Sequence, residues 1–240
     1  MTLSIDSVSV TPTSGKAPLS TRMVPSISDT EEYLVSHWPF EDNLNDIVSG
    51  HTMLFDNGPA YPPPAREEVY IEAGAVNKAI DLQYVDGYGV YWDVLQIPDD
   101  EDFYFTESDK RKIEFYLKEL EETAYIDGEN DSSLTLECDG FIYTMWRDQE
   151  TGGNLTFTIT DLVTYAYQEY VLEQTQFLDW KKITTTFNNT RLELYIDDVL
   201  QVPDSGYEVL QLSNSGAITI TIRTAQFHVA IDEFKYYNGF

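Results

Sequence analysis

The residues that could do chemistry in this 240-residue chain are mainly its 42 Asp and Glu, set against 14 Lys and Arg. Two carboxylates on one face of a strand could act as acid and nucleophile, and Glu193 and Asp197 have that spacing. With so many carboxylates, however, a solvated strand face explains such a pair better than catalysis. No G-x-S-x-G, H-E-x-x-H, Walker or G-x-G-x-x-G pattern is present. We therefore expect a protein that is not an enzyme.

Histidine and cysteine offer few other chemical possibilities. His37, His51 and His228 are isolated in sequence; the fold could bring them together, but packing in or beside strands accounts for two of them. Cys138 is the only cysteine, which excludes an intrachain disulfide and a thiolate zinc site. Acidic neighbours on both sides of Cys138 disfavour its thiolate, so we expect a structural residue.

The formal net charge of −28 excludes electrostatic binding to nucleic acid or to an anionic membrane. A content of 42% hydrophobic and 14% aromatic residues predicts a folded chain. The first residues have neither a basic region nor an apolar region, and no stretch of about 18 apolar residues occurs. We expect a soluble chain without a Sec-type signal and without membrane insertion.

The elements that must position these side chains are β-strands. Residues 1–30, rich in Ser, Thr and Pro, predict an extended N-terminal arm, and residues 31–240 predict one compact domain. Apolar and polar residues alternate within Leu155–Ile159 and Ile218–Ile222, which places one face inward and one toward water. Other β-rich runs recur between turn signals, at 33–40, 89–95, 133–138, 141–146, 182–187, 192–196 and 227–237. This pattern predicts an all-β, antiparallel two-sheet sandwich.

One segment, Ser108–Ala124, fits two structures. Ile113, Leu117, Leu120 and Ala124 share a face at helical spacing, with Ser108 as an N-cap. The same stretch also alternates at Ile113, Phe115 and Leu117, as a strand does. We favour a strand to about residue 118, followed by a turn or short helix.

Five segments follow one another in a recognisable order: Tyr33–Gly50, Ala73–Leu82, Lys112–Leu117, Trp180–Val199 and Ile231–Asn238. They resemble, in that order, the opening strand with its loop, the next two strands, a hairpin and the closing strand of the laminin G-like, concanavalin A-like lectin and glucanase jelly rolls. Two positions depart from the pattern, because Tyr116 replaces a Trp and Asp198 replaces a Gly. The resemblance implies a jelly-roll sandwich preceded by the extended arm, and it leaves function open because the superfamily is diverse.

Glycosidases on this scaffold present an E-x-D-x-E strand, and that motif is absent here. Glu107-Ser-Asp109 continues to Arg111, and Glu129-Asn-Asp131 continues to Ser133. The resemblance therefore does not imply glycoside hydrolysis.

The resemblance also implies a calcium site. In relatives, the Asp of the first loop and the Asp of the closing strand can share this ion, and the matching residues are Asp46 and Asp232. Asp42, Asn43 and Glu233 lie near them in sequence. The alternative is that Asp46 caps its own turn and that Asp232 is hydrogen-bonded within the sandwich.

Glycan binding is possible on the same scaffold through exposed aromatic residues. The candidates fall in the loop-rich stretch 59–92: Tyr61, Tyr84, Tyr88, Tyr91 and Trp92. The alternative is that these side chains pack at the rim of the sandwich.

The arm and the missing export signal together favour a virion surface protein, such as a capsid decoration, turret or tail-associated subunit. Residues 1–30 would dock on neighbouring virion subunits, in a homo-oligomer such as a trimer or ring. The sandwich would face outward and either reinforce the shell, contact the host surface, or do both. The alternative is a free, extracellular glycan-binding or adhesion module. An acidic, Lys-poor surface suits a high-salt medium and predicts a halophilic host.

Overall fold

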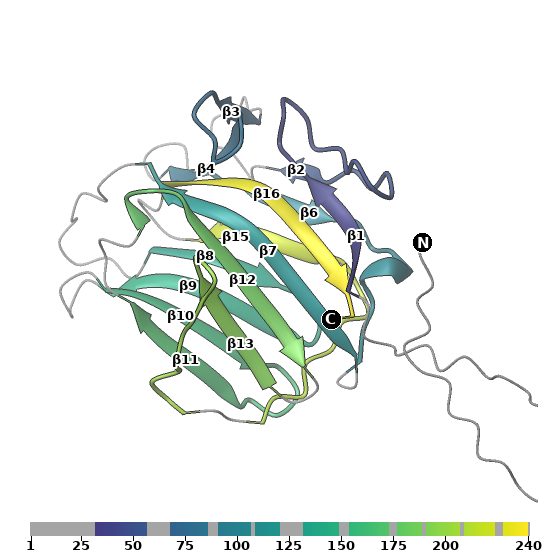
Figure 1. Cartoon of the computed structure of the whole chain (residues 1–240), viewed down its shortest axis with the longest axis vertical. Helices are drawn as coiled ribbons and strands as arrows, with labels where there is room; N and C mark the ends of the chain where they lie inside the picture. The colour runs from purple at the N-terminus through teal and green to yellow at the C-terminus, as the bar shows by residue number, and fades with distance from the viewer. Residues whose placement is uncertain are drawn as a thin grey trace, which may run out of the picture.

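The computed structural model describes residues 32–56, 68–85, 91–106, 109–120, 132–148, 154–172, 177–188, 191–206, 209–223 and 228–239. Two antiparallel sheets face one another as a concanavalin A-like jelly roll, as the sequence predicts (Figure 1). Residues 1–30 lie outside the described part, so the arm and its boundary stay predictions. None of the described residues forms a helix long and apolar enough to cross a membrane.

The nine-stranded sheet faces the viewer in Figure 1 and contains the opening and closing strands of the domain. Its path is β14 (Val199–Leu200), β13 (Arg191–Ile196), β12 (Lys181–Asn188), β7 (Lys110–Glu119), β16 (His228–Asn238), β4 (Ala79–Val85) and β3 (Val69–Ile71). Off this path, β1 (Tyr33–Trp38) pairs with β16, and β5 (Tyr91–Trp92) pairs with β4.

The seven-stranded sheet lies behind it. Its order is β11 (Tyr167–Leu172), β10 (Asn154–Asp161), β9 (Phe141–Asp148), β8 (Ser132–Glu137), β15 (Ile218–Arg223), β6 (Val94–Ile97) and β2 (Leu54–Asp56). A short 3-10 helix, η1 (Glu101–Phe103), follows β6, and its first turn is capped by the side chain of Asp100.

The structure confirms one predicted strand and divides another. The favoured strand after Ser108 is confirmed, since β7 runs from Lys110 to Glu119 with strictly alternating burial. The prediction of a single strand at 89–95 is wrong. Residues 91–92 form β5, which pairs with β4, whereas β6 begins at Val94 and pairs with β15 in the other sheet. The break falls at the buried Asp93, where the chain passes between β5 and β6.

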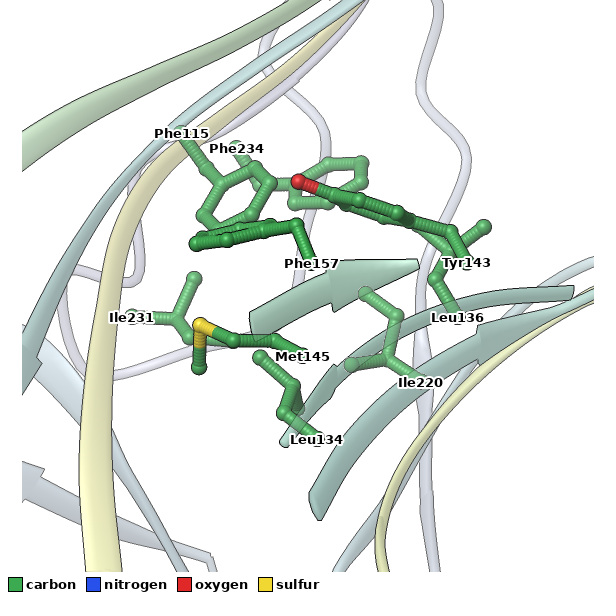
Figure 2. Close-up of a pocket in the computed structure, with 9 residues that line it drawn as sticks. All are labelled: Phe115, Leu134, Leu136, Tyr143, Met145, Phe157, Ile220, Ile231 and Phe234. Carbon is green, nitrogen blue, oxygen red and sulfur yellow. The ribbon is translucent and has the colours of Figure 1, made fainter. Parts of the chain in front are cut away.

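The space between the sheets is filled by inward apolar side chains. Phe115 on β7 stacks on Phe234 of β16 with ring centroids 5.6 Å apart. A void of about 10 Å³ lies among them, and its lining of mainly apolar side chains, with Met145, Phe157 and the phenol of Tyr143, is drawn in Figure 2. A void this small and apolar stays dry and holds no ligand. This part of the core therefore offers no room for a ligand.

The outward faces of the two sheets differ in chemistry. Six of the eight lysines of the chain belong to β7, β12 and β16 of the nine-stranded sheet: Lys110, Lys112, Lys118, Lys181, Lys182 and Lys235. The seven-stranded sheet instead aligns Thr221, Thr135, Thr144 and Thr158 in one row across four strands. Most lysines of the chain therefore lie in three adjacent strands of the nine-stranded sheet.

Candidate functional site

A groove of about 320 Å³ crosses the outward face of β7, β12 and β13. Its floor is formed by Thr184 and Thr186 on β12, whose side chains are short. Thr184 lies opposite Glu114 of β7 and Tyr195 of β13. Neighbouring strands are about 4.8 Å apart, so a short central side chain between two longer ones leaves an open channel. The groove therefore follows from strand register.

Thr186 forms a second row of residues across the three strands, arranged like the row of Glu114, Thr184 and Tyr195. Thr186 lies between Lys112 of β7 and Glu193 of β13. The Oγ1 atom of Thr186 is buried and has no hydrogen-bond partner among the described residues. Threonine hydroxyls on the floor and longer polar groups along both sides thus give the groove donors and acceptors in regular rows.

Ion pairs fix the long side chains at one end of the groove. Lys182 Nζ lies 3.3 Å from Glu114 Oε2 and 2.9 Å from Asp198 Oδ1. The hydrogen bond to Asp198, with further support from Glu114, raises the pKa of Lys182 well above its ordinary value. Lys182 therefore stays positively charged, and it balances two acidic groups that line the same groove.

Aromatic side chains contribute to this face as well. The Tyr195 hydroxyl donates to Glu193 Oε2 at 2.8 Å, which orients its ring beside the groove. Next to the groove, Lys112 Nζ lies 3.8 Å from the ring centroid of Tyr237 on β16. Burial, followed by the charge of Glu114, raises the pKa of Tyr237 to about 12, so this residue remains a neutral phenol. Hydroxyl, carboxylate, ammonium and phenol groups together suit a ligand that carries many hydroxyls.

The aromatic residues predicted as a glycan platform lie elsewhere. Tyr84 and Trp92 are cross-strand partners in β4 and β5, and Tyr91 pairs with Val85, while Tyr61 and Tyr88 lie outside the described residues. In the sheet order, β16 separates β4 from β7, so this hairpin is not part of the groove. The aromatic platform stays a prediction.

The first predicted calcium ligand, Asp46, is used by its own loop. Its Oδ1 accepts hydrogen bonds from the backbone amides of His37 and Val48, both at 2.8 Å, and its Oδ2 accepts from the Ser49 amide and hydroxyl. Burial alone would raise the pKa of Asp46, but the hydrogen bonds from His37, Ser49 and Val48 outweigh it and lower the pKa to about 2. This is the capping role that the sequence left open as the alternative.

The second predicted ligand, Asp232, is in a different situation. It is fully buried, Oδ2 accepts from the Val76 amide at 2.7 Å, and Oδ1 has no partner among the described residues. Gly74 permits this approach, because a Cβ there would lie 2.9 Å from Asp232 Oδ2. Burial raises the pKa of Asp232 to about 6. A buried carboxylate oxygen without a donor is a suitable calcium ligand.

The other predicted ligands have protein partners. Asp42 binds Lys78 Nζ at 2.7 Å, and Asn43 accepts from the Asn45 amide at 2.9 Å. Glu233 lies 2.8 Å from His37 Nε2 and 2.9 Å from Lys235 Nζ, beside the irregularity of β16 between Asp232 and Lys235. Within the described part of the chain, the residues grouped closely enough to hold a metal are His51, Asp100 and Asp102, none of which was predicted as a ligand.

The sequence-based interpretation of Cys138 agrees with the structure. The thiol is buried, and burial raises its pKa to about 12, with smaller contributions from the charges of Asp139 and Glu137. Cys138 is therefore a structural residue.

Sequence reasoning missed the groove because its floor depends on strand pairing. The alternation Lys182, Thr184, Thr186 marks one polar face of β12, and Lys112 and Glu114 mark that of β7. Neither pattern tells which residues lie opposite each other, since β7 and β12 are more than 60 positions apart in sequence.

No protein-family model and no curated protein matches the chain. Among solved structures, it is similar to the binding domain of Paraclostridial Mosquitocidal Protein 1, with 15% identity, a TM-score of 0.62, and coverage of 86% of this chain and 49% of that one. It is also similar to domain 4 of AbnA, an extracellular arabinanase from Geobacillus stearothermophilus, in complex with arabinotriose. That match has 12% identity, a TM-score of 0.55, and coverage of 87% and 94%.

A third similar structure is the binding domain of botulinum neurotoxin DC in complex with SialylT. The identity is 11%, the TM-score is 0.55, and the match covers 86% of this chain and 47% of that one. The chain thus spans about half the length of the two toxin binding domains. At these identities, the similarity establishes the fold alone, a two-sheet jelly roll.

Proposed function

We propose that this chain is a non-catalytic, extracellular carbohydrate-binding module that holds a glycan in the groove over β7, β12 and β13. The proposal rests on two rows of residues that lie side by side across β7, β12 and β13. One row is Glu114, Thr184 and Tyr195, and the other is Lys112, Thr186 and Glu193. Sugars present hydroxyl groups at regular spacing, which suits alternating donors and acceptors beside phenol rings. Two of the similar structures contain a sugar ligand by their own descriptions, arabinotriose and SialylT.

A glycan array followed by calorimetry with the strongest hit tests this proposal. Thr184→Met would fill the groove floor, whereas Thr144→Met places the same side chain on the outward row of the other sheet. We expect Thr184→Met to weaken binding at least about tenfold and Thr144→Met to leave the affinity unchanged. Equal affinity in both variants would contradict a site in the groove, and a blank array would contradict the glycan-binding function for the sugars tested.

A virion surface role is the second candidate, and it depends on the Ser-, Thr- and Pro-rich residues 1–30. In this role, the arm docks on neighbouring virion subunits of a homo-oligomer, and the groove contacts the host surface. The similar structures favour the glycan-binding module over this candidate. Detecting the protein in purified particles, and losing it from them when residues 1–30 are deleted, would support the virion role.

We also propose a structural calcium ion at Asp232. Its Oδ1, unpaired among the described residues, supports this position, since calcium prefers carboxylate and carbonyl oxygens. Asp46 is a poorer ligand, because both of its oxygens already accept hydrogen bonds. The ion would supply charge balance for a buried carboxylate and would stabilise the junction of β16 with the loop at Gly74.

A further inference from the structure

His51 is a well-positioned imidazole outside the groove. Its ring lies edge-on against Phe103, with centroids 4.9 Å apart and an interplanar angle of 62°. Its carbonyl oxygen accepts from the Trp38 indole at 3.1 Å and from the Asp46 amide at 2.8 Å. Only 13% of the side chain is exposed. The ring is therefore held in one orientation before any ligand arrives.

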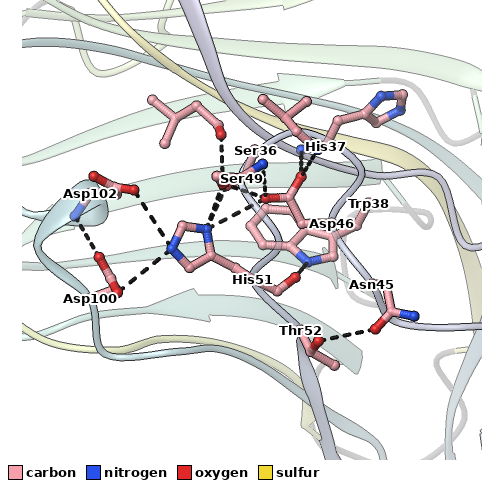
Figure 3. Close-up of polar contacts among 12 residues, drawn as sticks. Ser36, His37, Trp38, Asn45, Asp46, Ser49, His51, Thr52, Asp100 and Asp102 are labelled. Carbon is pink, nitrogen blue, oxygen red and sulfur yellow. Dashed lines mark hydrogen bonds and ion pairs between the residues drawn. The ribbon is translucent and has the colours of Figure 1, made fainter.

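The Nδ1 nitrogen of His51 lies near two serine hydroxyls, and the farther one, Ser36 Oγ, is 3.2 Å away. His51 Nδ1 lies 2.7 Å from Ser49 Oγ and 3.5 Å from Asp46 Oδ2 (Figure 3). The Ser49 hydroxyl has one proton, and its strongest acceptor is the Asp46 carboxylate. Ser49 Oγ therefore accepts from His51, which places the ring proton on Nδ1. In the neutral ring, the lone pair is then on Nε2.

The lone pair of Nε2 faces two carboxylates. Asp100 Oδ2 and Asp102 Oδ2 each lie 3.6 Å from His51 Nε2, one on either side in Figure 3. Three acceptor atoms that converge in this way repel one another unless a positive charge lies between them. The separations of 3.6 Å exceed the range of a hydrogen bond, so the contacts are not those of a well-formed imidazolium pair.

The two His51–carboxylate distances of 3.6 Å instead match those between ligands around a metal ion. Zinc binds imidazole nitrogen and carboxylate oxygen at about 2.0–2.2 Å, which puts tetrahedral ligands roughly 3.3–3.6 Å apart. The three ligand atoms here lie within 4.8 Å of one another. An imidazole nitrogen beside carboxylates favours a first-row transition ion over calcium, which prefers oxygen ligands only.

From this geometry, we propose that His51, Asp100 and Asp102 bind a divalent transition-metal ion such as Zn²⁺. Ser49 and Asp46 act as positioning residues, because they hold the proton of His51 on Nδ1, as a hydrogen-bonded partner does for metal-bound histidines. The Asp100 and Asp102 side chains are 45% and 56% exposed, so a fourth position is open to water or to a ligand group. The bound ion would also link the short helix η1 to the loop after β1.

The experiment is a calorimetric titration of the chelator-treated full chain with ZnCl₂, repeated by visible absorption with Co²⁺. We expect one ion per chain and absorption bands typical of a site with nitrogen and oxygen ligands. Asp102→Asn should weaken binding at least about tenfold. Asp99→Asn is the matched control in the same acidic run, because its carboxylate contacts Tyr104 and is not in the cluster. Ser49→Ala should weaken binding by roughly 10- to 100-fold.

Three results would overturn the proposal. Absence of saturable one-to-one binding would mean that His51, Asp100 and Asp102 do not form a metal site. Equal weakening by Asp99→Asn and Asp102→Asn would indicate diffuse binding to an acidic surface. A histidine NMR spectrum in which the His51 ring signals do not change on addition of Zn²⁺ would exclude it as a ligand. Asp232→Asn should leave zinc affinity unchanged, which separates this site from the calcium proposal.

Discussion

Lys182 on β12 reaches Glu114 on β7 at 3.3 Å, so one ammonium group spans two neighbouring strands at the end of the groove. Its other partner, Asp198, follows β13. The three strands that form the groove are therefore joined by one cation. Because this cation lies in the proposed glycan site, its removal should change glycan affinity.

Lys182→Met should reduce glycan affinity about tenfold, because Glu114 and Asp198 lose the cation that positions them. Stability should change by less than about 1 kcal/mol, since the pair is partly exposed. Lys181→Met is the control, as Lys181 pairs with Asp197 at 2.7 Å and does not line the groove. Calorimetry and thermal melts measure the two quantities. If both variants lost affinity equally, the groove would not be the site.

Acid should destabilise the protein through Asp161. Its carboxylate accepts hydrogen bonds from the Val163 and Thr164 amides, the Thr164 hydroxyl and the Gln211 amide. Burial alone would raise the pKa of Asp161, but the hydrogen bonds from Thr164, Gln211 and Val163 outweigh it and lower the pKa below its ordinary value of 3.8. Its stabilisation is thus complete above pH ~4 and is lost as pH falls through the lowered pKa.

Asp161→Asn tests this dependence. At pH 7, the variant should lose roughly 1.5–3 kcal/mol of unfolding free energy, because hydrogen bonds to a charged acceptor are replaced by weaker ones. Below the lowered pKa, the difference from the unmodified protein should shrink, as both side chains are then neutral. Urea denaturation across pH measures the difference. A gap that stayed constant from pH 7 to the lowest accessible pH would contradict the assignment.

Gly140 should tolerate no side chain. A Cβ at this position would lie 2.2 Å from the carbonyl oxygen of Ser213, which is backbone and has little room to move. Gly140→Ala should cost roughly 1–3 kcal/mol, which corresponds to a fall in melting temperature of about 2–4 °C per kcal/mol. Gly216→Ala is the control, since a Cβ at that glycine would meet no described atom within 4 Å. Comparable melting temperatures in the two variants would show that the segment at Ser213 shifts easily.

Calcium should raise the melting temperature if it binds at Asp232. An ion present at 100 times its Kd stabilises the folded state by about 2.7 kcal/mol. A chelator should reverse the gain, and Asp232→Asn should abolish it, whereas Asp42→Asn should not, because Asp42 is paired with Lys78 at the surface. A melting temperature that is insensitive to both chelator and calcium would end the calcium proposal.

Salt should stabilise this chain if its host is halophilic. The net charge of −28 creates self-repulsion that salt screens, with a Debye length of about 3 Å at 1 M. Melting temperature should therefore fall when NaCl is diluted from molar to millimolar concentration. An equal concentration of a neutral osmolyte serves as control. A flat salt dependence would count against a halophilic host.

Much of the fold was predictable because strand patterns are local. The alternation at Ile218–Ile222 and Leu155–Ile159 marks β15 and β10 without any tertiary information. The ambiguous segment after Ser108 is resolved only by its partners, since β7 lies in the middle of a sheet between β12 and β16. A central strand there buries every second residue on the core, which no isolated helix would do.

The candidate sites were less predictable, because each joins segments that are distant in sequence. The sequence marks Asp46 and Asp232 equally as calcium ligands. In the structure, loop amides donate hydrogen bonds to both oxygens of Asp46, whereas Oδ1 of Asp232 has no partner among the described residues. His51 gave no signal at all, because Asp100 and Asp102 reach it only through the folding of η1 against the first loop.

An acidic, all-β sandwich could be predicted from the amino-acid sequence, because charge, composition and two-residue periodicity are properties of the chain alone, and the resemblance of five segments added the jelly roll. The positions at which functional groups come together depend on the folded chain. Register placed Thr184 between Glu114 and Tyr195 and so opened the groove, and hydrogen-bond partners determined which carboxylates remain available to a ligand. Both depend on contacts between distant segments, which no local pattern encodes.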